Sequence, residues 1–162
     1  MATYLKSIGV KKGDCVVAFM PNTPETTISF LAVNSIGAIW SSTSPDFGTE
    51  SVIDRFAQIK PKVFITVDGY FYNGKTYDKT DVAIGIAKAL PTLENVIVFP
   101  YLNPDNISNF PKHYVNIKTV LETEANPLTF EPVPFNHPIW VLYSSGTTGL
   151  PKAIVHSHGG IL

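Results

Sequence analysis

The stretch CVVAFMPNTPETTISFLAVNSIGAIWSST, residues 15–43, carries the clearest fold signal in the sequence. It begins with an apolar, β-branched run at residues 15–20 and ends with a second strand pattern at residues 38–43. Between the two, Gly37 ends a helical pattern whose apolar residues share one face: Ile28, Leu31, Ala32 and Ile36. The stretch therefore predicts a strand, a helix and a second strand, and a helical crossover of this kind joins parallel neighbours in one sheet.

The same alternation continues toward the C-terminus. Residues 49–60 have apolar side chains at helical spacing, and residues 62–67 form the next apolar, β-branched run. A further helix is predicted at residues 81–90, followed by a strand at residues 95–100. This order predicts an α/β fold with a doubly wound, mainly parallel sheet that has helices on both faces.

The pattern weakens over residues 101–138, where prolines are frequent. We expect connecting structure there, with at most one short helix at residues 117–122. Two more strands are predicted at residues 139–145 and 153–158, and residues 141–143 should lie in an interior strand. No repeat and no boundary between two domains is evident.

Composition narrows the class of protein. The chain has 162 residues, of which 44% are hydrophobic, and its net charge is −1. This balance argues against nucleic acid as a partner, and no apolar run is long enough for membrane insertion. The one cysteine, Cys15, allows no internal disulfide and is interpreted as a structural thiol. We expect a cytosolic protein.

The segment SSGTTGLPK, residues 144–152, joins the last two predicted strands. Its glycines can take backbone angles that are closed to other residues, so that successive N–H groups can point at one anion. Hydroxyl groups add donors, and a lysine adds a mobile positive charge. The segment predicts a phosphate-binding loop made by Ser144, Ser145, Gly146, Thr147, Thr148, Gly149 and Lys152.

Two other interpretations of this loop are weaker. A Walker A loop has its lysine directly after a glycine and then starts a helix, whereas here Leu150 and Pro151 intervene and a strand pattern follows. A simple solvent-exposed hairpin turn would need only one or two glycines, and it leaves the four hydroxyls and the lysine unexplained.

The sequence YSSGTTGLPK resembles the phosphate-binding loop of the acyl-adenylate-forming (AMP-binding) enzymes, which include acyl-CoA synthetases, luciferases and peptide-synthetase adenylation domains. The stretch IGAIWSSTSPDFG and the nearby VIDRF are most similar to the acetoacetyl-CoA synthetases within this superfamily. The similarity runs from about residue 4 to residue 162. It implies that residues 1–162 are one part of a large N-terminal adenylation domain, truncated just after the phosphate-binding loop.

The resemblance implies a ligase that uses acetoacetate, ATP and coenzyme A, with Mg²⁺ on the phosphates. Lys152 would be the catalytic residue, and the loop residues named above would bind ATP. No residue of this chain is expected to ligate a metal, and the chain alone is expected to be inactive. The alternatives are a truncated nucleotide-binding or regulatory module, an inactive partial gene product, or a fragment of a related short-chain acyl-CoA synthetase.

Two further groups of residues are interpreted as structural. His156 and His158 share one face of a predicted strand and could in principle ligate a metal, but no third ligand accompanies them. The other group is assigned to packing or to the solvated surface, although relatives bring coenzyme A near this region and offer a base to its 3′-phosphate near Lys75. Its members are Trp40, Asp46, Phe47, Asp54 and Lys75.

Overall fold

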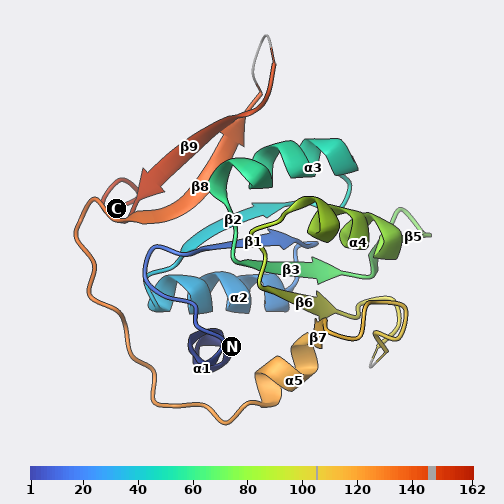
Figure 1. Cartoon of the computed structure of the whole chain (residues 1–162), viewed down its shortest axis with the longest axis horizontal. Helices are drawn as coiled ribbons and strands as arrows, with labels where there is room; N and C mark the ends of the chain where they lie inside the picture. The colour runs from blue at the N-terminus through green and yellow to red at the C-terminus, as the bar shows by residue number, and fades with distance from the viewer. Residues whose placement is uncertain (105, 146–148) are drawn as a thin grey trace.

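The computed structural model describes residues 1–104, 106–145 and 149–162. Seven strands form one sheet in the order β7-β6-β3-β1-β2-β8-β9, and a separate hairpin pairs β4 with β5 (Figure 1). The sheet strands are β1 (Cys15–Phe19), β2 (Ile39–Thr43), β3 (Val63–Val67), β6 (Asn95–Phe99), β7 (Val115–Asn116), β8 (Pro138–Ser144) and β9 (Lys152–Ser157). All pairings in the sheet are parallel except that of β8 with β9.

Helices cover both faces of this sheet (Figure 1). One face carries α1 (Ala2–Ser7), α2 (Pro24–Ser35) and α5 (Ile117–Glu122), and the other carries α3 (Thr49–Phe56) and α4 (Thr80–Ala89). A short 3₁₀ helix, η1 (Ala57–Ile59), extends α3. The doubly wound, mainly parallel fold predicted from the sequence is confirmed. None of the helices in the described ranges is long and apolar enough to cross a membrane.

The core divides into two layers because side chains alternate along each strand. In β1, Val16 and Ala18 pack with α1, α2 and α5, whereas Val17 and Phe19 pack with α3 and α4. All four of these side chains are fully buried. Because β1 is buried on both faces, it is apolar without interruption, as the sequence of residues 15–20 indicates.

The buried face of α2 differs in part from the predicted one. Ile28 is 42% exposed and Leu31 is 59% exposed, whereas Ser29 and Val33 are fully buried. Ser29 Oγ donates a hydrogen bond to the carbonyl oxygen of Glu25, 2.7 Å away. The hydroxyl is thereby satisfied within the helix, so a small polar side chain can occupy the packed face.

Four elements of the described ranges were not predicted: α1, β7, and the two strands of a hairpin, β4 (Gly69–Tyr72) and β5 (Lys75–Asp78). The hairpin turn is formed by Asn73 and Gly74, which both have positive φ angles, of 48° and 72°. Asn-Gly is the strongest short signal for such a turn, so the hairpin could have been found in the sequence. The predicted helix at residues 117–122 is confirmed as α5.

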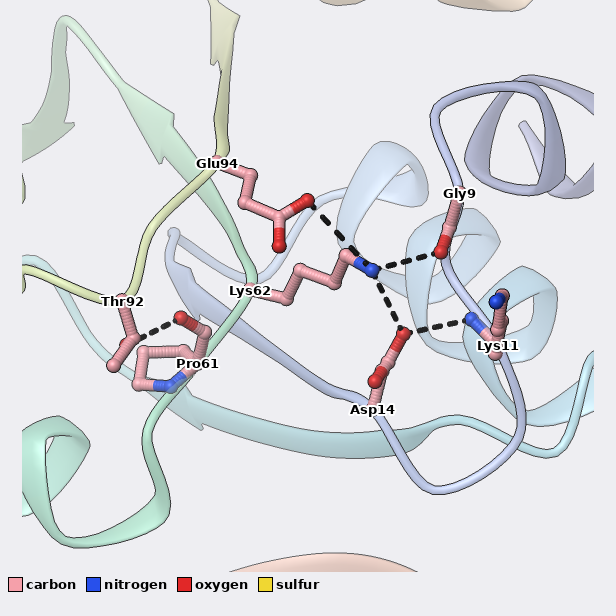
Figure 2. Close-up of polar contacts among 7 residues, drawn as sticks. All are labelled: Gly9, Lys11, Asp14, Pro61, Lys62, Thr92 and Glu94. Atoms are coloured by element: carbon pink, nitrogen blue, oxygen red, sulfur yellow. Dashed lines mark hydrogen bonds and ion pairs between the residues drawn. The ribbon is translucent and has the colours of Figure 1, made fainter.

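The parallel strands give the sheet two different edges. At the amino ends of β1, β3 and β6, Lys62 Nζ lies 2.8 Å from the Gly9 carbonyl oxygen, 3.3 Å from Asp14 Oδ2 and 3.6 Å from Glu94 Oε2 (Figure 2). Asp14 Oδ2 also accepts a hydrogen bond from the Lys11 backbone N–H, at 2.8 Å. The carboxyl ends of the strands lie at the opposite edge, where ligands bind in open α/β sheets.

Candidate functional site

Strand β8 brings the predicted phosphate-binding loop to the carboxyl edge of the sheet. It lies between β2 and β9, and it pairs in parallel with β2 at Trp40 and Trp140. Ser41 Oγ donates to the Val141 carbonyl oxygen at 2.7 Å. Because β8 is paired on both sides, the prediction of an interior strand at residues 141–143 is confirmed, with Val141 3% exposed and Leu142 47% exposed.

The two ends of the loop lie opposite each other. Ser144, the last residue of β8, is paired with Lys152, the first residue of β9. Directly opposed side chains of an antiparallel pair leave the sheet on the same face, so both residues present their side chains on one side of the loop. Both residues are exposed, as is Ser145. Lys152 was expected in the loop, one residue before the strand, and is instead the first residue of the strand.

The middle of the loop is only partly described. Gly149 has a φ of +155°, which L-amino acids rarely adopt, and this agrees with the prediction that glycine is needed for its backbone angles. The predicted ligand-binding residues Gly146, Thr147 and Thr148 lie outside the described residues. The described part of the loop can donate hydrogen bonds to an anion from two hydroxyls and one ammonium group.

Contacts with the end of α3 and with η1 hold both sides of the loop. Tyr143 Oη donates to the Arg55 carbonyl oxygen at 2.8 Å, and Gln58 Nε2 donates to the Pro151 carbonyl oxygen at 2.9 Å. The Arg55 guanidinium lies over the rings of Phe47 and Tyr143, at 5.0 and 5.9 Å. Burial raises the pKa of Tyr143 to about 12. These anchoring residues were not predicted, because no sequence pattern links positions about ninety residues apart.

The histidines of β9 and the following turn have neighbours of their own. The His156 ring lies 6.2 Å from the Trp140 ring, and the His158 ring lies 5.9 Å from that of His137. His137 Nε2 is within 2.8 Å of the Gly37 carbonyl oxygen, and burial, followed by the proximity of His137, lowers the pKa of His158. Within the described ranges, no cluster of three or more His, Cys, Asp or Glu residues could hold a metal ion.

A second feature of the carboxyl edge is an aromatic pocket of about 490 Å³. The segments that follow β1 and β2 form one side of it, and the β4–β5 hairpin forms the other. Tyr70 and Tyr77 are stacked, with ring centroids 5.1 Å apart. The pocket is lined by Pro21, Asn22, Ser44, Pro45, Asp46, Tyr70, Phe71, Tyr72 and Tyr77.

Residues that were assigned to packing or to the surface fall on both sides of this pocket. Trp40 is 6% exposed and contacts the Phe30 ring edge-on at 6.0 Å, so its assignment to packing is confirmed. Asp46 lines the pocket, and Lys75 is exposed and lies opposite Tyr72 in the hairpin. The pocket was not predicted, because the hairpin that forms one wall was not predicted either.

Comparison with known proteins agrees with this geometry. Acetoacetyl-CoA synthetase from Gallus gallus is 45% identical over 99% of the chain, and acetoacetyl-coenzyme A synthetase from Rhizobium meliloti (strain 1021) is 48% identical over 98%. The solved structure of acetoacetyl-CoA synthetase from Streptomyces lividans superposes with a TM-score of 0.92 over 99% of the chain, at 47% identity.

The chain spans only about a quarter of the length of these relatives: 25% of the Gallus gallus protein and 24% of the other two. A model of the AMP-binding enzyme family matches residues 1–162. The sheet, the position of the loop at its carboxyl edge and these matches lead to one conclusion. The chain belongs to the AMP-binding enzyme family.

Proposed function

We propose that this chain provides the phosphate-binding part of an acyl-adenylate-forming ligase that makes acetoacetyl-CoA from acetoacetate, ATP and coenzyme A. The observation that carries the proposal is the position of the two described ends of SSGTTGLPK at the carboxyl edge, with Ser144, Ser145 and Lys152 exposed there. The relatives that match nearly the whole chain, each named an acetoacetyl-CoA synthetase, support the choice of acid.

In the first step, a carboxylate oxygen of acetoacetate bonds to the α-phosphorus of ATP, and the bond from that phosphorus to the bridging oxygen of pyrophosphate breaks. Negative charge grows on the departing pyrophosphate. A cation and hydroxyl donors at that position lower the barrier, because their interaction strengthens as the charge develops. We assign this role to Lys152, with Ser144, Ser145, Thr147 and Thr148 as donors.

Mg²⁺ would accompany ATP and neutralise part of the phosphate charge. The described loop residues have hydroxyl and ammonium groups but no carboxylate, so they fit a metal that is held through phosphate oxygens. In the second step, the coenzyme A sulfur bonds to the acyl carbon, AMP leaves with the bonding electrons and the thiol proton is released.

The aromatic pocket is our candidate for part of the coenzyme A site. It opens at the same edge as the loop, and its tyrosines offer flat faces of the kind on which a nucleotide base stacks. Lys75 is exposed beside Tyr72 and can reach an anionic group of a bound ligand. The family resemblance, which brings coenzyme A and its 3′-phosphate to this region, supports the assignment.

The test is a chimaera in which residues 1–162 replace the matching part of the Streptomyces lividans enzyme. We expect acetoacetate-dependent ATP–pyrophosphate exchange that exceeds the exchange with acetate, and we expect the 162-residue chain alone to show none. A folded chimaera without exchange, beside an active parent enzyme, would contradict the proposal. Acetoacetate-dependent AMP formation by the isolated chain would contradict the view that it needs further residues.

A further inference from the structure

A buried carboxylate immediately precedes the hairpin that forms one wall of the aromatic pocket. Asp68, which follows β3, is only 3% exposed. Its Oδ1 accepts hydrogen bonds from the backbone N–H groups of Tyr101 and Leu102, at 2.8 and 2.9 Å. Its Oδ2 accepts from the backbone N–H of Asn103 at 2.9 Å and from the Asn103 side chain at 3.4 Å. Hydrogen bonds to a carboxylate are stronger than those between neutral groups, so this turn is held firmly.

The same residue closes the base of the hairpin. The Lys79 backbone N–H donates to the Asp68 carbonyl oxygen at 2.8 Å, so Asp68 and Lys79 flank the two hairpin strands. The Asp68 backbone N–H donates to the Phe99 carbonyl oxygen, at 3.4 Å. Asp68 therefore joins the hairpin to the turn that follows β6 through both its side chain and its backbone.

The turn and the hairpin pack together without spare room. A Cβ atom on Gly69 would lie 2.3 Å from Leu102 Cδ1 and 2.3 Å from the Tyr77 carbonyl oxygen, which is closer than real Cβ contacts allow. The Tyr101 ring meets the Phe71 ring edge-on, at 5.8 Å. A shift of residues 101–103 would thus be transmitted to Phe71 and Tyr77, which line the pocket.

We propose that Asp68 is a positioning residue for the coenzyme A site: it holds the turn at residues 101–103 against the hairpin and so sets the pocket aromatics before the ligand arrives. This inference rests on the proposed function, which assigns the aromatic pocket to coenzyme A. A preordered pocket loses less side-chain and loop entropy when it binds. Its disruption should weaken coenzyme A binding and leave the phosphate-binding loop, on β8 and β9, unaffected.

The test is the variant Asp68→Asn. It keeps the side-chain volume but places an amide NH₂, which cannot accept a hydrogen bond, against backbone N–H donors. We expect the dissociation constant of the 162-residue chain for coenzyme A, measured by calorimetry, to rise roughly tenfold, the scale of losing the preorganisation of one or two side chains. The dissociation constant for magnesium pyrophosphate should not change. Asp54→Asn, the same chemical change on α3, is the matched control and should match the parent chain for both ligands.

A second variant covers the case in which Asp68→Asn does not fold. Leu102→Ala keeps every hydrogen bond of the turn and removes the side chain that contacts Gly69. It should weaken coenzyme A binding by roughly threefold, since only packing is lost. Amide hydrogen exchange of residues 101–103 should be faster in Asp68→Asn than in the parent chain, and exchange of the β8 amides should be equal.

The outcomes separate this inference from the proposed function. Unchanged coenzyme A affinity in folded Asp68→Asn, or an equal loss for coenzyme A and pyrophosphate, overturns the positioning role while the coenzyme site remains. No saturable coenzyme A binding by the parent chain overturns the coenzyme site itself, and the inference with it. A loss of affinity for coenzyme A alone supports both the positioning role of Asp68 and the assignment of the coenzyme A site.

Discussion

The two edges of the sheet differ in whether their polar groups are paired within the protein or exposed to solvent. At the amino edge, Lys62 is surrounded by a carbonyl oxygen and two carboxylates, and its side chain is only 21% exposed (Figure 2). At the carboxyl edge, Ser144, Ser145 and Lys152 are exposed to solvent. Paired polar groups stabilise the fold, whereas exposed donors gathered at one place remain available to a ligand.

A lysine at one end of a strand is not by itself a sign of a ligand-binding site. Both Lys62 and Lys152 lie at the beginning of a strand, next to β3 and in β9. Because β9 runs antiparallel to its neighbour, its beginning lies at the carboxyl edge, where ligands bind. Strand direction, which the sheet decides, thus separates a structural lysine from a candidate catalytic one.

The largest expected effect is at the carboxyl edge. In the chimaera described above, Lys152→Ala should lower the adenylation rate by roughly ten- to a thousandfold, the scale of losing one charged transition-state contact. The measurement is pyrophosphate exchange at saturating ATP. Lys88→Ala, an exposed lysine on α4, is the control and should leave the rate unchanged. A normal rate in Lys152→Ala together with loss of exchange in His156→Ala would favour a histidine metal site over a phosphate-binding loop.

At the amino edge we expect an effect on stability alone. Lys62→Met removes the ion pairs and the hydrogen bond to Gly9, and should lower the free energy of unfolding by about 1–2 kcal/mol, since these contacts are partly exposed. Urea denaturation measures the change, with Lys88→Met as the control. Pyrophosphate exchange of the folded chimaera should not change. A loss of exchange at unchanged stability would mean that the two edges do not divide stability from binding.

The smallest expected effect concerns Tyr143, which connects the candidate site to α3. Burial raises its pKa from 10.0 to about 12, so folding favours the protonated form. The stability that this group contributes is complete below pH 10 and is lost as the pH rises toward 12, because the unfolded chain then releases the proton first. Below pH 10, Tyr143→Phe should be less stable than the parent by about 1 kcal/mol, because it lacks the hydrogen bond to the Arg55 carbonyl oxygen.

The measurement for Tyr143 is the difference in unfolding free energy between parent and variant across pH 8 to 12. The difference should shrink and then reverse sign at the alkaline end, because a pKa raised from 10.0 to about 12 costs the parent up to about 2.7 kcal/mol, more than the hydrogen bond of about 1 kcal/mol contributes. Taking the difference removes the contribution of the other tyrosines and the lysines. A difference that stays constant with pH would show that the hydroxyl titrates equally in the folded and unfolded chains.

Local patterns in the sequence were enough to predict most of the sheet. Strands β1, β3 and β6 are mostly apolar runs of five residues that alternate with helical patterns, so their existence and parallel direction follow from alternation alone. The β4–β5 hairpin was missed although Asn73 and Gly74 signal it. The prediction of the buried face of α2 was partly wrong, because serines with hydrogen-bonded hydroxyls occupy packed positions where larger apolar residues were expected. Such exchanges depend on how closely a helix approaches its sheet, which periodicity does not specify.

The α/β class, the loop SSGTTGLPK and the resemblance to the family could all be found in the sequence, because each depends on residues that are near one another along the chain. Which polar residues meet across long separations depends on the tertiary structure. Asp68 binds the turn at residues 101–103, and Gln58 binds Pro151, 93 residues away. These contacts exist because strands distant in sequence end at one edge of a parallel sheet, and a sequence pattern has no means of specifying that proximity.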